Sequence, residues 1–437
     1  MSGGHTHTDH GRPGRTAVRA ALIVLGVVAA ATAVAMFWLW PGDRPEAQPA
    51  GIESAAGTVV AVESEPCPDS GDVTDSPGAT PGPSGCGTAT IAVEEGPGAG
   101  QEVEAPLPAG LNAIEVGVGD DVTLDHFPDE AEGQGSYQIA DHQRGTELWV
   151  LGAAFALAVV AFGRLRGLTA LAGLAVTFAV LLFFVVPAIL DGRSPLLVAI
   201  VGSVAIMLVV LYLTHGLNTP TTIAVIGTLV SLVLTGLLAA AATGLTHLTG
   251  VADENSNYLS LVFGVDMRGL LLASILIGSL GVLDDVTVTQ SATVVELAKA
   301  NPAYGFARLY RAATRIGRSH IASVINTIIL AYAGASLPVL ILIAAADRPV
   351  GQVLTTQVIA QELVRSAVGT IGLIAAVPVT TALAAFVAHR FAGPAPEPDV
   401  PADVPGPRPI AAKGAWLEMY ETDDEPPAAT PRALPGR

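Results

Sequence analysis

Long apolar runs are the feature of this sequence that most restricts its fold. Several reach about 18 to 25 residues, the length at which an α-helix crosses the hydrocarbon core of a bilayer. Because 51% of the residues are hydrophobic and only 14% are charged, a soluble core could not hide all of this apolar surface. We therefore predict an α-helical polytopic membrane protein of about eight transmembrane helices, with a small extracytoplasmic β-domain between helices 1 and 2. The predicted spans are residues 17–40, 148–162, 168–190, 196–213, 222–243, 270–296, 321–346 and 367–388.

The basic residues predict the orientation, because Lys and Arg near span ends stay on the cytoplasmic side. Arg12, Arg15 and Arg19 precede the first span, and the densest basic cluster lies between residues 299 and 318. Placing both groups inside gives a protein of the bacterial plasma membrane with both termini cytoplasmic. A cleaved signal peptide is the alternative for the first span, but its apolar stretch exceeds the roughly 7 to 15 residues of a signal core. We expect an uncleaved anchor.

Residues 41–146 differ abruptly in composition from the apolar runs. They hold roughly twenty acids against only Arg44 and Arg144. Short alternating stretches separated by Gly and Pro predict strands of an acidic, extracytoplasmic β-rich domain. The predicted strands are "GTVVAVES", "GTATIAVEE", "NAIEVGVGDDVTLDHF" and "YQIAD". The negative charge excludes nucleic acid as a partner.

Cys67 and Cys86 are the only cysteines of the chain. They flank a stretch rich in Gly, Pro and Ser, in the segment predicted to lie where thiols oxidise. We predict that they form a disulfide, and two unpaired thiols are the alternative.

The two ends of the chain carry too little apolar content to fold. We predict a disordered N-terminus over residues 1–16 and a disordered Pro-rich cytoplasmic tail over 391–437, on either side of a seven-helix transmembrane domain at 147–390. His5, His7 and His10 could chelate a metal on a flexible strand, but a low-complexity tip is the favoured interpretation. We predict no metal site and no cofactor.

Catalytic motifs are missing from the sequence. The only two lysines, Lys299 and Lys413, follow no Gly-rich run, so there is no Walker A loop. Neither an HExxH helix nor a GxSxG elbow accompanies the spans. We therefore do not expect an enzyme.

Two adjacent carboxylates stand in the sixth span, within "GVLDDVTVTQ" at residues 281–290. A helix rising 1.5 Å per residue from Arg268 reaches Asp284 after about 24 Å, still inside a hydrocarbon core about 30 Å thick. Intramembrane ionisable groups are costly and are functional by default. The predicted path for an ion, proton or solute comprises Asp284, Asp285, Thr287 and Ser291 with His320, Asn326 and Thr327 of the next span. Alternatively, the helix ends early and the acids pair with Arg315 or Arg318 at the interface.

These two spans carry a resemblance. "LLLASILIGSLGVLDDVTVTQSATVVEL" and "RIGRSHIASVINTIILAYAGASLPVL" resemble the YibE/F-like family of multi-pass bacterial membrane proteins, as do "YQIADHQRGTELWVLGAAF", "VVPAILDGRSP" and "HGLNTPTTIAVIGT". The resemblance extends from about residue 57 to 389 and implies an integral membrane protein, without a defined biochemical activity. The two adjacent aspartates depart from the family pattern, in which many relatives have a single Asp. Their positions in the motif favour Asp285 as the equivalent of that single Asp.

Two functions from different classes follow. The first is a secondary transporter or permease whose intramembrane carboxylates bind a proton or cation, with an unknown small solute or ion as its substrate. The second is a non-transporting membrane scaffold or sensor whose outer β-domain binds an envelope component, with the polar residues serving to pack helices.

Overall fold

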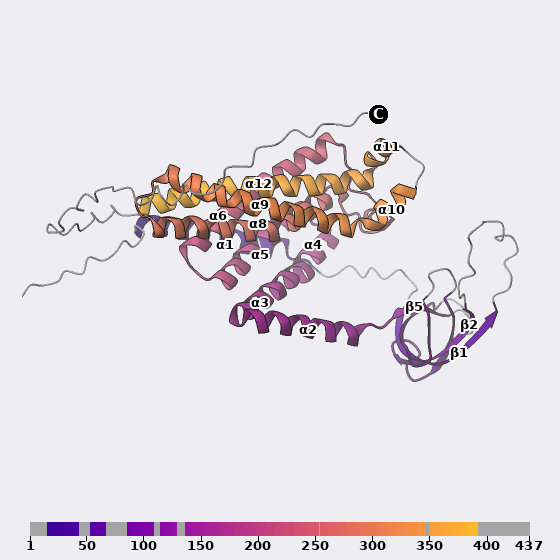
Figure 1. Ribbon diagram of the computed structural model, residues 1–437. Coiled ribbons are helices and arrows are strands. Elements are labelled where there is room, and N and C mark those ends of the chain that lie inside the picture. The colour runs from indigo at the N-terminus through magenta and orange to yellow at the C-terminus, as the bar shows by residue number, and fades with distance from the viewer. Residues whose placement is uncertain are drawn as a thin grey trace, which may run out of the picture. The chain divides into compact units, whose positions relative to one another are not determined.

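The computed structural model describes residues 15–42, 53–66, 85–108, 114–128, 136–252, 254–345 and 349–391. Within these ranges the chain is mostly helical and carries one small antiparallel sheet (Figure 1). Helix α1 (Arg15–Leu39) precedes the strands, and the remaining helices follow them. Of the predicted tails, only residues 15, 16 and 391 are described, and they belong to helices at either end of the described part. The three N-terminal histidines lie outside the described residues.

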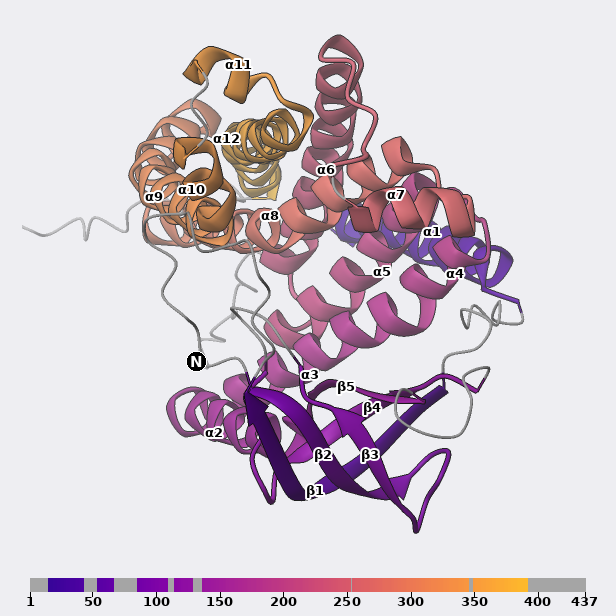
Figure 2. The ribbon, with the colours of Figure 1, turned by 90° about the vertical axis from the view of Figure 1, so that its right-hand side faces the viewer.

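Five strands form the sheet, in the order β3-β2-β1-β4-β5 (Figure 2). They are β1 (Glu53–Pro66), β2 (Gly85–Glu95), β3 (Glu102–Pro106), β4 (Asp121–His126) and β5 (Tyr137–His142). Strand β3 was not predicted, and within the described residues 114–127 of the predicted strand at 112–127, only β4 is a strand. The other predicted strands are confirmed.

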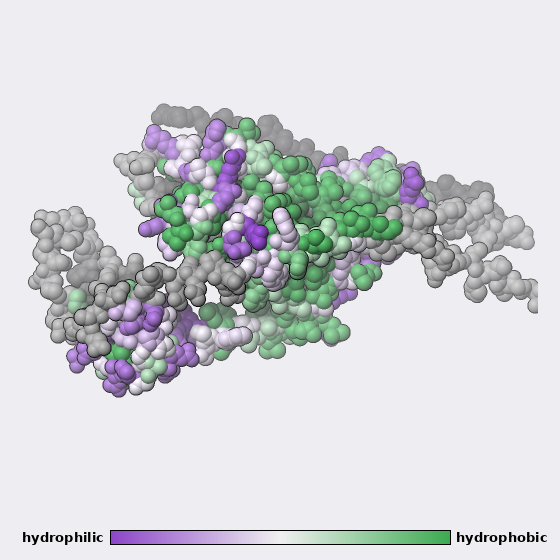
Figure 3. All heavy atoms as spheres, turned by 180° about the vertical axis from the view of Figure 1, so that it is seen from behind, coloured by the Kyte–Doolittle hydropathy of each residue, from purple (hydrophilic) through white to green (hydrophobic). Residues whose placement is uncertain are grey.

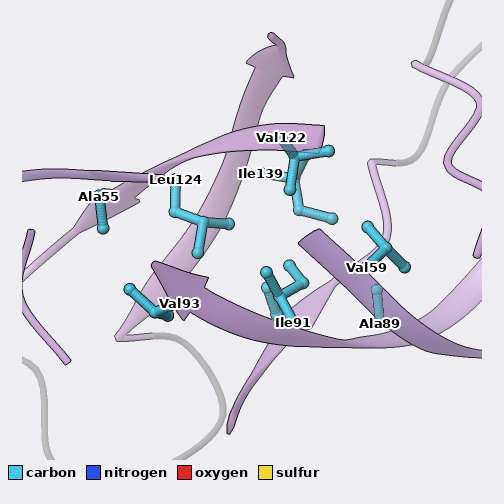
Figure 4. Close-up of a cluster of buried hydrophobic side chains, with 9 residues drawn as sticks. Ala55, Val59, Ala89, Ile91, Val93, Val122, Leu124 and Ile139 are labelled. Carbon is cyan, nitrogen blue, oxygen red and sulfur yellow. The ribbon is translucent and has the colours of Figure 1, made fainter. Parts of the chain in front are cut away.

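Alternate side chains of a strand point to the same side of a sheet. Because apolar residues alternate with polar ones in these strands, one side of the sheet is apolar. Its buried side chains converge (Figure 4); they are Ala55, Val59, Ala89, Ile91, Val93, Ala105, Val122, Leu124 and Ile139. This cluster gives the sheet a core of its own.

The helices after the sheet are α2 (Gly145–Gly163), α3 (Leu165–Val180), α4 (Val186–Leu190), α5 (Pro195–His215), α6 (Thr219–Leu245), α7 (Glu254–Phe263), α8 (Met267–Ala300), α9 (Phe306–Ala335), α10 (Leu337–Ala345), α11 (Val350–Leu354) and α12 (Gln357–Phe391). A π-helical turn, Leu181–Val185, joins α3 to α4. It lies just before Pro187, which has no N–H to bond the preceding turn and whose ring would crowd a regular α-helix there.

Six of these helical segments are long and apolar enough to cross a membrane: α2, α3 with α4, α5, α6, α8 and α12. Two predicted spans are not among these six. The span at 17–40 falls on α1, of which Ile23–Leu39 is apolar, and the side chains before residue 23 lie outside the described part. The span at 321–346 falls on the end of α9 and on α10, which are separated at Ser336, shortly before Pro338. Proline has no N–H to donate to the carbonyl four residues earlier, and its ring crowds that carbonyl, which accounts for a break just before Pro338.

Helix α8 lies at the centre of the helical part and contacts α5, α6, α9 and α12. Figure 1 shows α6, α8, α9 and α12 running side by side. In contrast to the central helix α8, α2 has no buried residue. Its side chains Trp149 and Phe162 are 81% and 98% exposed. Hydrophobic side chains cover much of the visible surface of the helices, with hydrophilic patches mainly towards their ends, and the visible surface of the sheet is mostly hydrophilic or neutral (Figure 3). This apolar surface indicates contact with a lipid bilayer.

Candidate functional site

The two aspartates of α8 point in different directions. Consecutive side chains on a helix diverge by about 100°. Asp285 is exposed, whereas Asp284 is half-buried and its Oδ1 atom is fully shielded. That oxygen has no hydrogen-bond partner among the described residues. The arrangement therefore singles out Asp284 as the carboxylate that enters the bundle.

Hydroxyl groups from two helices lie beside Asp284. The Thr228 hydroxyl of α6 neighbours its carboxyl group. The same hydroxyl is 2.7 Å from the Oγ1 atom of Thr287, and both threonines are completely buried. The Thr287 hydroxyl also donates to the main-chain carbonyl of Asp284, at 3.1 Å. One turn further along α8, the buried Ser291 hydroxyl donates to the carbonyl of Pro220, at 2.9 Å. Thr287 and Ser291 thus both face α6, on the side of Asp284 predicted from their spacing.

Buried hydroxyls continue along α6 beyond Thr228. They belong to Thr221, Thr228, Ser231, Thr235 and Thr243, each at most 2% exposed. At 1.5 Å per residue the series spans about 33 Å, close to the thickness of a hydrocarbon core. Some of these groups bond to their own helix: Ser231 donates to the carbonyl of Gly227, and Thr235 to that of Ser231, both at 2.8 Å. The α6 hydroxyls were not predicted, although the spacing of three and four residues in "GTLVSLVLT" was a signal for them.

Gln290 of α8 joins two further helices. It is 3% exposed. Its Nε2 donates to the carbonyl of Ala313 in α9, at 3.0 Å, and to the Thr381 hydroxyl in α12, at 2.7 Å. Gly317 of α9 leaves the space for this side chain, because a Cβ there would come within 2.7 Å of the Gln290 Oε1 atom. Gln290 thus fixes α9 and α12 against α8.

The predicted polar residues of α9 do not join Asp284. Asn326 and Thr327 are exposed, and the Thr327 hydroxyl donates to the carbonyl of Ser323 in its own helix, at 3.1 Å. The expectation that they face the aspartates is therefore not met. The reason is the face of the helix on which each residue lies. An apolar face of α9 that includes Ile321 and Ile325 packs towards α8. Asn326 and Thr327 lie outside that face.

His320 is half-buried, and its Nε2 atom is shielded without a hydrogen-bond partner in the described part of the chain. No ion pair among the described residues involves His320, Asp284 or Asp285. The alternative in which the acids pair with Arg315 or Arg318 is therefore not what the structure shows.

Helices α6 and α12 approach closely at two reciprocal contacts. A Cβ on Gly227 would lie 2.5 Å from the Thr380 Oγ1 atom, and a Cβ on Gly372 would collide with the Thr235 hydroxyl. The glycine of each helix thus receives the threonine of the other. The numbering runs in opposite directions along the two helices, so they are antiparallel here.

The remaining predicted sites lie in or near the sheet. Cys67 is outside the described residues, so its pairing with Cys86 stays a prediction. Strand β1 ends at Pro66, which is paired with Gly85, and the next pair is Glu65 with Cys86. The register therefore brings Cys86 to the end of the hairpin where Cys67 follows. Within the described ranges, no three His, Cys, Asp or Glu side chains gather as a metal site would require.

The apolar helices and the carboxylate within them define a multi-pass membrane protein. The family described as YibE/F-like protein matches residues 151–390, more than half of the chain. The protein therefore belongs to the YibE/F-like family, as its sequence indicated. Comparison with curated proteins and with solved structures gave no match.

Proposed function

We propose that this protein is a secondary transporter or permease in which the Asp284 carboxylate binds a proton or a cation during transport. The observation that carries the proposal is the shielded, unpartnered Oδ1 atom of Asp284 inside a bundle of apolar helices. A bare ionised carboxylate is strongly unfavourable in such surroundings, so a proton or cation must accompany it. A group that has to be neutralised in this way is suited to coupling.

The hydroxyls of α6 support a path to and from this carboxylate. Thr228 and Thr287 place two oxygen atoms 2.7 Å apart beside it. The buried series on α6 runs most of the length of that helix. Hydroxyls both donate and accept hydrogen bonds, which suits them to pass a proton or to replace part of a cation's hydration shell.

The proposed roles of the two aspartates differ. Position in the family pattern favoured Asp285, but its exposed side chain costs less to ionise than one enclosed by helices. We assign the coupling role to Asp284 and treat Asp285 as its matched control, since both substitutions remove one carboxylate from adjacent positions of α8.

The test is flux into proteoliposomes containing the wild type, Asp284→Asn or Asp285→Asn. Proton uptake is followed with an internal pH-sensitive dye under an imposed membrane potential, and sodium and potassium uptake with their radioactive isotopes. We expect flux of at least one of these ions above that of protein-free liposomes, lost in Asp284→Asn and retained in Asp285→Asn. Equal flux in all three proteins, above that of protein-free liposomes, would leave Asp284 a packing role only. No flux above the liposomes in any of the three would favour the scaffold or sensor.

A further inference from the structure

The first half of α9 carries a stripe of arginines. Arg308, Arg311, Arg315 and Arg318 follow one another at spacings of three and four residues, which places them on one side of the helix. All four are exposed. The opposite side is firmly packed: Leu309 and Ala313 are buried against apolar side chains of α6, α8 and α12. The arginines are therefore presented by an anchored helix.

Among the described residues, these arginines have no acidic partner. The sequence contains no Asp or Glu between Leu297 and Ala346. None of the four takes part in an ion pair within the described ranges, whereas neighbouring Lys299 is paired with Glu296, at 2.7 Å. Four like charges side by side repel one another, so a bound anion would stabilise this stripe.

Three of the arginines line an open cavity on the surface of the helices. It has a volume of about 370 Å³ and is lined by Tyr304, Arg308, Arg311, Ala312 and Arg315. Tyr304 comes from the short connection between α8 and α9, where its N–H donates to the carbonyl of Asn301 at 3.1 Å. Three arginines that line one cavity suit a phosphate, because a guanidinium group binds phosphate oxygen atoms in a two-pronged manner.

Aromatic residues indicate the depth of this cavity. Phe306 and Tyr310 stack with their ring centroids 6.0 Å apart, close to Tyr304 along the chain. Aromatic side chains of this kind gather at the level of lipid headgroups. Tyr304 follows the end of α8 by four residues, and α8 is one of the helices apolar enough to span the bilayer. Arginines beside aromatic rings are the combination expected at the level of phospholipid phosphates.

We propose that this pocket binds the phosphate of an anionic phospholipid headgroup. Basic pockets beside transmembrane helices bind such headgroups in general. A lipid held here would neutralise the arginine stripe and fix the start of α9, which Gln290 in turn holds against α8.

The experiment measures lipid occupancy by native mass spectrometry of the full-length protein in detergent. Phosphatidylglycerol is the probe, phosphatidylcholine is the neutral comparison, and inorganic phosphate is added as a competitor. Arg308→Gln with Arg311→Gln is compared with Arg166→Gln plus Arg390→Gln, which removes the same charge at other helix ends. We expect the pocket variant to bind phosphatidylglycerol roughly 30-fold more weakly, and the control to match the wild type.

A third protein, with Lys at positions 308 and 311, keeps the charge should the Gln variant fail to fold. It should bind phosphatidylglycerol more weakly than the wild type but still in preference to phosphatidylcholine. Equal losses in the pocket and control variants would overturn the proposal in favour of diffuse attraction. Displacement of phosphatidylglycerol by millimolar inorganic phosphate would overturn it in favour of a site for free anions.

Discussion

At the scale of single residues, the hydroxyl pair of Thr228 and Thr287 joins α6 to α8 directly beside Asp284. Both side chains are fully buried, so neither can turn to water if its partner is lost. Removing one hydroxyl leaves the other with an unmet hydrogen bond, and such a loss costs about 1 to 3 kcal/mol.

Thr228→Val keeps the shape of the side chain and removes only this hydroxyl. We expect the free energy of unfolding to fall by about 1 to 3 kcal/mol. Thermal unfolding in detergent measures the change, with Thr289→Val as the control because Thr289 is exposed on the same helix as Thr287. An equal effect of both substitutions would contradict a special role for the buried pair.

The chemistry of this site was predictable from the sequence, but its geometry was not. The run "LDDVTVTQS" predicted polar groups at membrane depth and the stripe of Asp284, Thr287 and Ser291. Which aspartate turns inward depends on the rotation of α8 about its axis, which its neighbours set. The α6 threonines were missed because isolated hydroxyls in an apolar run do not reveal the helix that they will face.

At the scale of the elements, α6 and α12 are held close by two glycines. Gly372→Ala would push its new methyl group into Thr235. Overpacking of this kind typically costs about 1 to 3 kcal/mol. We expect a clear drop in the apparent Tm, measured in detergent.

Gly369→Ala on the same helix is the control, since nothing lies within 4 Å of a Cβ there. It should be neutral or slightly stabilising, because alanine favours the helix by about 0.5 to 1 kcal/mol over glycine. A similar drop in both variants would argue against close approach at Gly372.

The hairpin of β1 and β2 provides a second prediction at this scale. A disulfide between Cys67 and Cys86 would close a loop of about twenty residues, and the chain-entropy model assigns it about 3 kcal/mol. Mass spectrometry of the protein digested without reductant should find the two cysteines linked in one peptide pair. Recovery of both as free thiols would disprove the prediction.

Two elements were misjudged because their sequences lack strong periodic signals. Strand β3, "EVEAP", is short and half acidic, and it forms because β2 offers it a paired edge. Helix α9 begins at Phe306 rather than near residue 321, since its first turns bury one apolar face and expose arginines. A search for long apolar runs does not detect an amphipathic helix of this kind.

At the scale of the whole molecule, the membrane class and the family were predictable, because long apolar runs and ordered polar motifs are direct properties of the sequence. The way in which the helices are assembled was not, since it depends on contacts such as that of Gln290 with Thr381.

Orientation is also a property of the whole molecule, and the basic clusters predict that the α8–α9 connection is cytoplasmic and the sheet extracytoplasmic. Single cysteines at Ala303 and Val118, both exposed, test this in intact cells after Cys67 and Cys86 are replaced by serine. An impermeant thiol reagent should label the cysteine at 118 and spare the one at 303 until the cells are opened. Labelling of position 303 in intact cells would reverse the predicted orientation.

The reciprocal contacts of α6 and α12 also have a genetic consequence. Each glycine fits one threonine of the opposite helix, so damage from Gly372→Ala should be repaired by a smaller side chain at Thr235, whereas damage from Gly227→Ala should need a change at Thr380. Revertants of the two mutants should therefore fall into two separate classes. Each suppressor should be specific to its own allele, and neither should rescue the other.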